Sequence, residues 1–529
     1  MLRVLKRVGV NGTQAGQPAP HGQDGLRGAN SQSPVSLFRG RHLSEERPSG
    51  EASAPEAGRN RQVSEPVRNH DLVVALPFAA AAACLLAFLL WLSAHPARRE
   101  VERVPLARAA PSVKKAEAGL NAGTLISGLG KPSAHAGSWP QFRGARRDNI
   151  AATSKGVAPA WPPEGPRVVW RIPVGEGYAG AAIHQGRVYL VDYDHEKKED
   201  AIRCLSLDNG EEIWRYTYSV EVKRNHGMSR TVPAVNDRFV VALGPKCHVH
   251  CLEAASGQLV WKKDLVEEHG AAVPPWYAGQ CPLIEEDRVI LAPGGKPLMM
   301  AVDLATGKTI WQTEGCEGLG MTHSSIMPLD FNGRRQYVYC AQSGVVGVSA
   351  EDGRLLWTKP DWKISIANIP SPVPIGDGRI FFTGGYNAGS AMVRLKDEGG
   401  AWATEEIFRL KPTVFAVEQH TPILCQGRLY GVIPSGELVC LGLDGTPLWS
   451  SGPENRFGLG PSILVDGYIL ILDDKTGTLH LVKADPTGYD EIARAKLLNG
   501  PDPWGPMALA EGRLVLRDST EMVCVELGG

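Results

Sequence analysis

The sequence predicts an all-β protein, an eight-bladed β-propeller with four-stranded blades, preceded by one transmembrane helix and a disordered N-terminal tail. Three observations predict this. A strand–turn–strand unit ending in Trp recurs at intervals of 41–51 residues. A second hairpin of similar design precedes most copies of that unit. One long uncharged apolar run stands apart from the repeats, at residues 72–92.

The repeat unit is clearest at Ala301–Trp311, which reads AVDLATGKTIW. It consists of an apolar strand, a tight turn containing Gly and a second strand that ends in Trp. A period of about 45 residues is typical of a propeller blade or a solenoid repeat. Phe408 and Ala493 mark two degenerate copies. The intact copies are marked by Trp170, Trp214, Trp261, Trp311, Trp357 and Trp449.

The second hairpin, for example PAVNDRFVVAL at 233–243, gives each unit its other two strands. Short β-rich runs flanking turns of Gly, Asp and Asn are the usual hairpin signal. The first strand carries a proline in seven of the eight units. Proline removes a backbone donor and is tolerated on edge strands, so we expect the first strand to line the central channel. These prolines are Pro233, Pro282, Pro328, Pro374, Pro422, Pro461 and Pro506.

The two ends of the repeat region complement each other. The region begins with a Trp strand, VVWRI at 168–172, that has no third strand before it. It ends with a third strand, MVCVEL at 522–527, that has no Trp strand after it. Together they complete an eighth blade, and closing the ring removes exposed sheet edges.

The chain divides into a tail (1–71), an apolar segment (72–92), a linker (93–137) and the propeller (138–529). The tail is rich in Gly, Ser, Pro, Gln and Asn, a composition typical of disorder. The apolar segment has 21 residues without a charge, and at about 1.5 Å per residue it spans a hydrocarbon core of about 30 Å. The alternative is the apolar part of a cleaved signal sequence, although the segment starts late for one.

Charge does not orient this segment, because three Lys or Arg residues lie within fifteen residues on each side. We expect a single-pass helix in the cytoplasmic membrane with the propeller on the periplasmic, extracytoplasmic side. Residues 138–529 carry 39 Lys and Arg against 47 Asp and Glu. This acidic body argues against a nucleic-acid partner, and we expect a monomeric propeller.

The stretch Lys246–Cys251, KCHVHC, has the composition of a metal site but not the geometry. Side chains alternate along a strand, so the two cysteines face one way and the two histidines the other. Two histidines alone are too few ligands for a zinc site. The alignment of Cys251 with Cys204 in the repeat predicts a packing role. The ten cysteines contain no CxxC pair, so neither a disulfide scaffold nor a zinc finger is indicated, and we predict no metal ligand.

The unit AVDLATGKTIW resembles the tryptophan-docking repeat of PQQ-type β-propellers at Ala301, Asp303, Thr306, Gly307, Lys308 and Trp311. The stretch WPQFRG at 139–144 is similar to the lead-in of many such proteins, and the likeness covers about 390 residues. The family includes the outer-membrane assembly factor BamB and quinone-dependent alcohol dehydrogenases. The resemblance implies that the repeat tryptophans dock blades on one another.

The resemblance implies two functions. The first is a non-catalytic scaffold that recognises a cell-envelope protein or a small ligand and needs no cofactor. The second is an oxidoreductase that uses PQQ and calcium, but the adjacent cysteine pair of those dehydrogenases is absent here. A third interpretation is a sensor of a polysaccharide or small molecule. No catalytic residue is predicted, because no GxSxG, HExxH or GxxxxGK[ST] motif occurs.

We expect any ligand to bind at the mouth of the channel, where the loops entering the first strands converge. Arg and Gln next to aromatic side chains suit a peptide or a small anion, while a plain solvated rim is the alternative interpretation. The acidic and basic run at 194–200 is interpreted as a solvated hairpin tip, with calcium binding as the alternative. The predicted rim residues are Tyr178, Arg230, Gln280, His323, Asn368, Gln419, His420 and Trp504.

Overall fold

The computed structural model describes residues 113–114, 123–135, 137–152, 156–158, 160–314, 316 and 318–528. The predicted tail (1–71) and transmembrane helix (72–92) lie outside these residues, as does most of the predicted linker (93–137). Among the residues that are described, no helix combines the length and the apolar character needed to cross a membrane.

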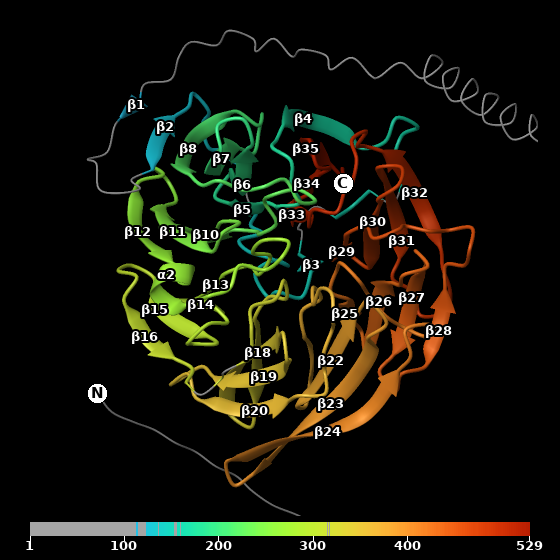
Figure 1. The fold of residues 1–529 in the computed structure, drawn as a ribbon. Helices are drawn as coiled ribbons and strands as arrows, with labels where there is room; N and C mark the ends of the chain where they lie inside the picture. Colours follow the sequence, from blue (N-terminus) through green and yellow to red (C-terminus); the bar gives the residue numbers. More distant parts are fainter. Residues whose placement is uncertain are drawn as a thin grey trace, which may run out of the picture. The chain divides into compact units, whose positions relative to one another are not determined.

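Eight antiparallel blades surround a central axis (Figure 1), which confirms the predicted eight-bladed all-β propeller with four-stranded blades. We number the blades 1–8 in chain order. Their first strands contact one another around the axis, β5 with β9 for example, and so line the channel. The first strands are β5 (Ala182–His184), β9 (Ala234–Val235), β13 (Leu283–Glu285), β17 (Met327–Phe331), β21 (Val373–Gly376), β25 (Ile423–Cys425), β29 (Ser462–Val465) and β33 (Ala508–Ala510).

The second and third strands form the buried middle of each blade. The second strands are β6 (Arg187–Asp194), β10 (Phe239–Leu243), β14 (Arg288–Leu291), β18 (Arg334–Ala341), β22 (Arg379–Gly384), β26 (Arg428–Val432), β30 (Tyr468–Asp473) and β34 (Arg513–Arg517). The third strands are β7 (Glu199–Ser206), β11 (His248–Glu253), β15 (Met300–Asp303), β19 (Gly344–Ser349), β23 (Gly389–Glu398), β27 (Leu438–Gly442), β31 (Thr478–Lys483) and β35 (Glu521–Glu526). They read as near-continuous apolar runs because neighbouring blades cover both of their faces.

The fourth strands form the outer edge of the propeller. They are β8 (Glu212–Ser219), β12 (Leu259–Asp264), β16 (Thr309–Gln312), β20 (Leu355–Lys359), β24 (Ala401–Leu410), β28 (Pro447–Ser450), β32 (Glu491–Lys496) and, in blade 8, β4 (Arg167–Pro173). Strand β4 pairs with β35, with Trp170 opposite Cys524. The ring is therefore closed by the two ends of the repeat region, as the sequence predicts.

The repeat tryptophans join neighbouring blades through one recurring contact. The indole Nε1 of Trp311 in blade 3 donates a hydrogen bond to the backbone oxygen of Ala350 in blade 4 at 3.1 Å. The ring lies against Gly353 in the same turn of blade 4, where there is no room for a Cβ atom. The equivalent bonds run from Trp170 to Leu207, Trp214 to Ala254, Trp261 to Leu304 and Trp449 to Asp485.

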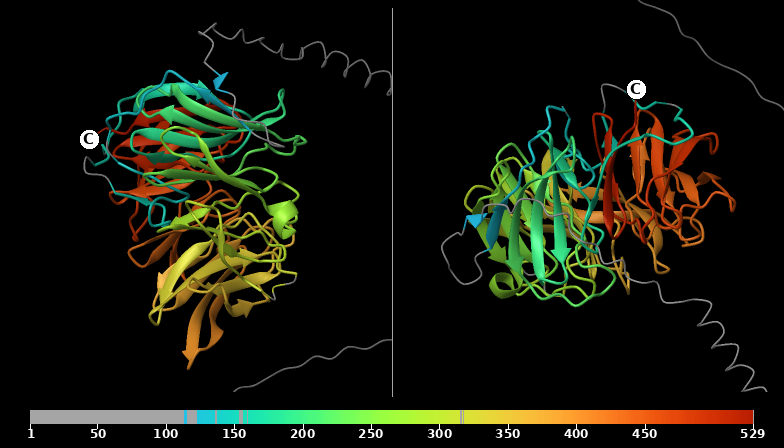
Figure 2. Two further views of the ribbon diagram at one scale, coloured as in Figure 1. Left: turned by 90° about the vertical axis from the view of Figure 1, so that its left-hand side faces the viewer. Right: turned by 90° about the horizontal axis from the view of Figure 1, so that it is seen from above.

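Trp357 departs from this pattern, which corrects the expectation that it docks on the next blade. Its Nε1 donates to the side-chain oxygen of Gln336 in its own blade at 2.9 Å. In blade 5, β23 and β24 each run for ten residues before they turn at Gly399 and Gly400. The turn that would receive Trp357 is thereby carried away from it. The long hairpin extends beyond the neighbouring blades in Figures 1 and 2.

Within the described residues, three further strands and one short helix are added to the ring. β2 (Thr124–Ser127), from the predicted linker, pairs with the outer edge of blade 1, and β1 (Val113–Lys114) pairs with β2. β3 (Ile150–Ala151) runs parallel to the inner strand of blade 7. The single-turn helix α2 (Leu265–His269) follows β12 and is capped by the side chain of Asp264.

The KCHVHC stretch spans the contacts of blade 2 with both neighbouring blades. On the side of blade 3, the sulfur atom of Cys247 lies 3.8 Å from that of Met321. On the side of blade 1, the ring of His250 lies 4.2 Å from that of Tyr218. Cysteines and histidines thus face opposite ways, and both sets are packing residues in this arrangement.

Candidate functional site

Six of the eight predicted rim side chains line a single cavity at the mouth of the channel. The cavity has a volume of about 90 Å³ and is walled by loops that lead into the first strands of several blades. The loops of blades 1, 2, 4, 6 and 8 meet here although they are far apart in the sequence. The six residues are Tyr178, Arg230, His323, Gln419, His420 and Trp504.

Arg230 is the cation of this cavity. Its Nε and Nη2 groups donate to the backbone oxygens of Trp276 and of residues 225–227. Its guanidinium carbon lies 5.0 Å from the centre of the Tyr178 ring, whose centre lies 5.0 Å from that of Trp504. Burial lowers the pKa of Arg230 below its usual value and raises the pKa of Tyr178 to about 12. At neutral pH the cavity therefore holds one guanidinium ion beside a neutral aromatic wall.

The two histidines of the mouth are uncharged at neutral pH. Burial, together with the neighbouring Arg230, lowers the pKa of His323 to about 4. Burial, together with the charge of Arg143, lowers the pKa of His420 to about 4. The Nε2 atom of each ring is buried and has no hydrogen-bond partner in the described part of the chain.

Gln280 and Asn368, which the sequence also placed at the rim, do not line the cavity. The amide of Gln280 forms two hydrogen bonds with the backbone of Ala292, at 2.6 and 2.7 Å, and is fully buried. The amide of Asn368 donates to the backbone oxygen of Ala341 at 3.4 Å. The Gln280 side chain thus bonds within blade 3, and the Asn368 side chain ties the loop that leads into blade 5 to blade 4.

The segment 139–151 crosses the channel beside the mouth, a role that was not predicted for WPQFRG. Trp139 pairs with Ile183 of blade 1, and β3 pairs with blade 7. Between these points Arg143 donates to the backbone oxygens of Thr421 and Pro422 at 2.7 and 2.9 Å. Phe142 from this segment forms part of the cavity wall. The segment ties together blades that are not neighbours in the ring.

Two arginines of this segment lie buried inside the channel. Burial lowers the pKa of Arg143 to about 9 and that of Arg147 to about 10. Arg147 stacks on Phe142 at 5.7 Å, and its Nε and Nη2 atoms have no hydrogen-bond partner among the described residues. The carboxylate of Asp148 opposes this lowering at Arg143, and that of Glu285 opposes it at Arg147. The channel next to the mouth therefore holds two buried guanidinium groups whose charge nearby carboxylates offset in part.

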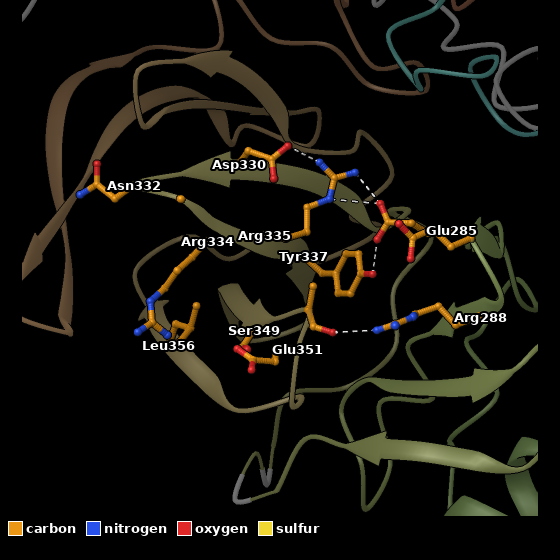
Figure 3. Close-up of a pocket in the computed structure, with 13 residues that line it drawn as sticks. Glu285, Arg288, Asp330, Asn332, Arg334, Arg335, Tyr337, Ser349, Glu351 and Leu356 are labelled. Atoms are coloured by element: carbon orange, nitrogen blue, oxygen red, sulfur yellow. Dashed lines mark hydrogen bonds and ion pairs between the residues drawn. The ribbon is translucent and has the colours of Figure 1, made fainter. Parts of the chain in front are cut away.

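A larger hollow of about 810 Å³ lies between blades 3 and 4, away from the mouth (Figure 3). Arg335 bridges Asp330 and Glu285, and the Tyr337 hydroxyl also donates to Glu285. Arg288 donates to the backbone oxygen of Ala350 at 3.2 Å. The charges at the centre of this hollow are thus matched within the protein, whereas the charge of the mouth is not.

The residues of the mouth do not fit PQQ with calcium, the cofactors that the resemblance implies for a dehydrogenase. No carboxylate lines the cavity. Across the described part of the chain, no three His, Cys, Asp or Glu side chains are grouped so that they could hold a metal ion. The volume of about 90 Å³ is also well below the roughly 300–1,000 Å³ that is usual for a cofactor pocket.

Comparison with known proteins shows which proteins the propeller is similar to. Residues 198–443 match the family model for the outer membrane protein assembly factor BamB, a PQQ-repeat family. BamB of Yersinia pestis is 23% identical over 340 residues, which cover 60% of this chain and 79% of that protein. BamB of Moranella endobia (strain PCIT) is 22% identical over 333 residues, covering 60% of this chain and 70% of that protein.

Two solved structures are similar to this chain at low sequence identity. The quinohemoprotein alcohol dehydrogenase of Comamonas testosteroni is 12% identical, with a TM-score of 0.50 over 74% of this chain and 81% of that one. At this identity the likeness shows the fold alone. BamB of Moraxella catarrhalis is 14% identical, with a TM-score of 0.47 over 68% of this chain and 97% of that one. The family match, the repeats and the eight blades together support a PQQ-repeat, BamB-like β-propeller.

Proposed function

We propose that this protein is a non-catalytic recognition scaffold of the cell envelope, which binds a protein or ligand at the rim of its propeller. The curated relatives are named as outer membrane protein assembly factors, which supports a role among envelope proteins. In this proposal residues 72–92 anchor the chain in the cytoplasmic membrane as a single-pass helix, and the propeller (138–529) works on the extracytoplasmic side. The apolar character of that segment supports the anchor.

One observation carries the proposal: the mouth cavity adjoins a wide groove on the same face of the propeller. The groove lies between blades 5 and 6 and has a volume of about 920 Å³. Tyr386, Val414 and Trp449 give it an apolar and aromatic lining. Glu418 lines the groove and the next residue, Gln419, lines the mouth, so the two features adjoin at this point of the chain.

Groove and mouth together offer what a binding surface needs. Aromatic side chains and arginine are the residue types that contribute most to binding at protein interfaces. The groove also carries the acidic Glu418 and Glu437, while the mouth carries Arg230. A partner would therefore meet apolar contact area flanked by charges of opposite sign, which favours one orientation of binding.

Site-specific photo-crosslinking in the native host tests the scaffold. A photoreactive amino acid replaces the exposed Thr413 of the groove. The matched control replaces the exposed Thr306, in the turn between β15 and β16 at the opposite face. We expect an envelope protein or ligand to be captured from position 413 and not from position 306. Equal capture from both positions, or none from 413, would contradict the proposal.

The dehydrogenase alternative is tested by a separate titration of the full chain with PQQ and calcium. We expect no saturable binding, because the mouth lacks both the volume and the carboxylates for these groups. Saturable one-to-one binding would overturn the scaffold proposal and return the channel to consideration as an active site.

A further inference from the structure

We propose that the mouth cavity binds a small organic carboxylate, held by Arg230 against the aromatic wall. This inference rests on the proposed function, since it assigns a ligand class to the recognition site of the scaffold. The ligand is an anion with a flat or apolar body, small enough to fit the cavity.

The charge of the channel is the first step. Arg230, Arg143 and Arg147 lie in or beside the mouth, and burial lowers the pKa of all three. The cavity lining contains no carboxylate. Asp148 and Glu285 offset part of the charge of Arg143 and Arg147, whereas the groups that act in this way on Arg230 are tyrosines. Burying charge without a partner is unfavourable. A bound anion would supply the missing counter-charge.

The donors of Arg230 are the second step. Four backbone oxygens fix its Nε and Nη2 groups, which holds the guanidinium plane in place over Tyr178. No hydrogen bond of Nη1 to another described residue is formed. A preorganised, unpaired N–H group of an arginine is well suited to a carboxylate oxygen, because charge-assisted hydrogen bonds are short and strong.

The remaining walls decide what kind of anion fits. The rings of Tyr178 and Trp504 pack on each other with centres 5.0 Å apart and form an aromatic part of the cavity lining, which favours a ligand with a flat or apolar body. His323 and His420 are neutral because burial lowers the pKa of each to about 4. They therefore add polar contacts without adding charge. One guanidinium group, an aromatic wall and about 90 Å³ of space suit a small monocarboxylate better than a large polyanion.

Isothermal titration of the full chain with benzoate tests the proposal. Benzamide has the same shape without the charge and is the ligand control. We expect saturable one-to-one binding of benzoate, and binding of benzamide that is weaker by about tenfold or more, as expected for the loss of a charge-assisted hydrogen bond. Arg230→Gln should weaken benzoate binding by a similar factor, and Arg230→Lys should have an intermediate effect because it keeps the charge but loses the planar donors.

Arg224→Gln is the matched protein control. Arg224 is an exposed arginine of the same loop, paired with Glu176 at 2.8 Å and absent from the cavity lining. It should leave benzoate binding unchanged. The proposal fails if benzoate does not bind, if benzamide binds equally well, or if Arg224→Gln and Arg230→Gln act alike. If Arg230→Gln does not fold, the comparison of benzoate with benzamide on the native chain still decides.

The two proposals can fail separately. Capture of a partner from position 413 without benzoate binding would leave the scaffold standing and remove the carboxylate site. Benzoate binding without capture from position 413 would leave the carboxylate site standing and contradict a scaffold role of the groove.

Discussion

The seam between blades 3 and 4 and the seam between blades 4 and 5 solve the same packing problem in different ways. At the first, Trp311 lies on Gly353 and donates to the backbone of the next blade. At the second, Trp357 donates to Gln336 within its own blade. Charged side chains bridge this second seam: Lys359 of blade 4 lies 3.0 Å from Glu406 of blade 5.

Further contacts join blades 4 and 5 at the second seam, where Trp357 does not contact the next blade. Arg409 of blade 5 pairs with Asp361 at 2.6 Å and its guanidinium lies 5.9 Å from the ring of Trp362. Trp362 is buried and packs on Phe382 of blade 5, with ring centres 5.9 Å apart. The difference teaches that the Trp-and-Gly repeat is one way to join blades, and that a seam without it needs several specific polar and aromatic contacts.

The largest expected loss of stability is at the seam between blades 3 and 4, where Trp311 makes the regular contact. In Gly353→Ala the new Cβ would lie 2.4 Å from the Trp311 ring, at a residue with a φ of +75°. We expect the free energy of unfolding to fall by about 3 kcal/mol, from left-handed backbone strain and overpacking together. Denaturant unfolding measures it.

Gly400→Ala, in the long hairpin of blade 5, separates the two causes of that loss. Its φ is +95° but nothing lies within 4 Å of the new Cβ. We expect this variant to lower the free energy of unfolding by only about 1 kcal/mol, because it introduces backbone strain without overpacking. Equal losses in the two variants would mean that the contact with Trp311 contributes nothing to docking.

The second prediction compares the two indole groups directly. Trp311→Phe removes one donor from the Ala350 oxygen, which still accepts a bond from Arg288. Trp357→Phe leaves the buried side chain of Gln336 without its donor, and the Nε2 of that glutamine already lacks a partner within the described chain. We therefore expect a loss of about 1 kcal/mol for the first variant and about 2 kcal/mol for the second. Thermal and denaturant unfolding of both variants measures the two losses. If Trp357 contributed only through packing, Trp357→Phe would not be the more destabilised variant.

The sequence contains a sign of the irregular hairpin in blade 5, but little that indicates how the side chains at the mouth are arranged. In regular copies the turn glycine precedes the marker Trp by four residues, as Gly307 precedes Trp311. In blade 5, Gly400 precedes Phe408 by eight residues, and the extra length is the long hairpin. The repeat period, the prolines and the complementary ends were enough to predict the blades and their closure. They could not show which contact each Trp makes.

The channel segment could not be predicted, because its partners are remote in the sequence. Arg143 bonds to residues almost 280 positions away, at Thr421 and Pro422. The propeller topology brings the loop residues together at the mouth, but it does not set the direction of their side chains. For this reason Gln280 was predicted at the rim, whereas its side chain bonds to the backbone of its own blade. The predicted linker likewise packs on blade 1 from residue 123, where Gly128 lets its backbone come close to Glu212.

The smallest expected effect concerns the charged bridge of the second seam, and it depends on pH. Hydrogen bonds from Arg409, and then from Lys359, lower the pKa of Glu406 to about 2 from its usual 4.5. Since the folded pKa is the lower one, this carboxylate contributes stability above pH of about 4.5, and the contribution is lost as the pH falls toward 2. We expect Glu406→Gln to cost about 0.5–1 kcal/mol at neutral pH, because solvent screens a partly exposed pair.

Glu405→Gln is the matched control for this bridge. Glu405 is the neighbouring residue on the same strand, but it pairs with Lys396 inside the hairpin at 3.1 Å and does not reach blade 4. It should change stability by less than Glu406→Gln at neutral pH, and the gap between the two variants should close near pH 2 and shrink in high salt. If the two variants unfold alike at neutral pH, the charges do not join blades 4 and 5, and the aromatic packing of Trp362 on Phe382 is left as the contact that holds the seam.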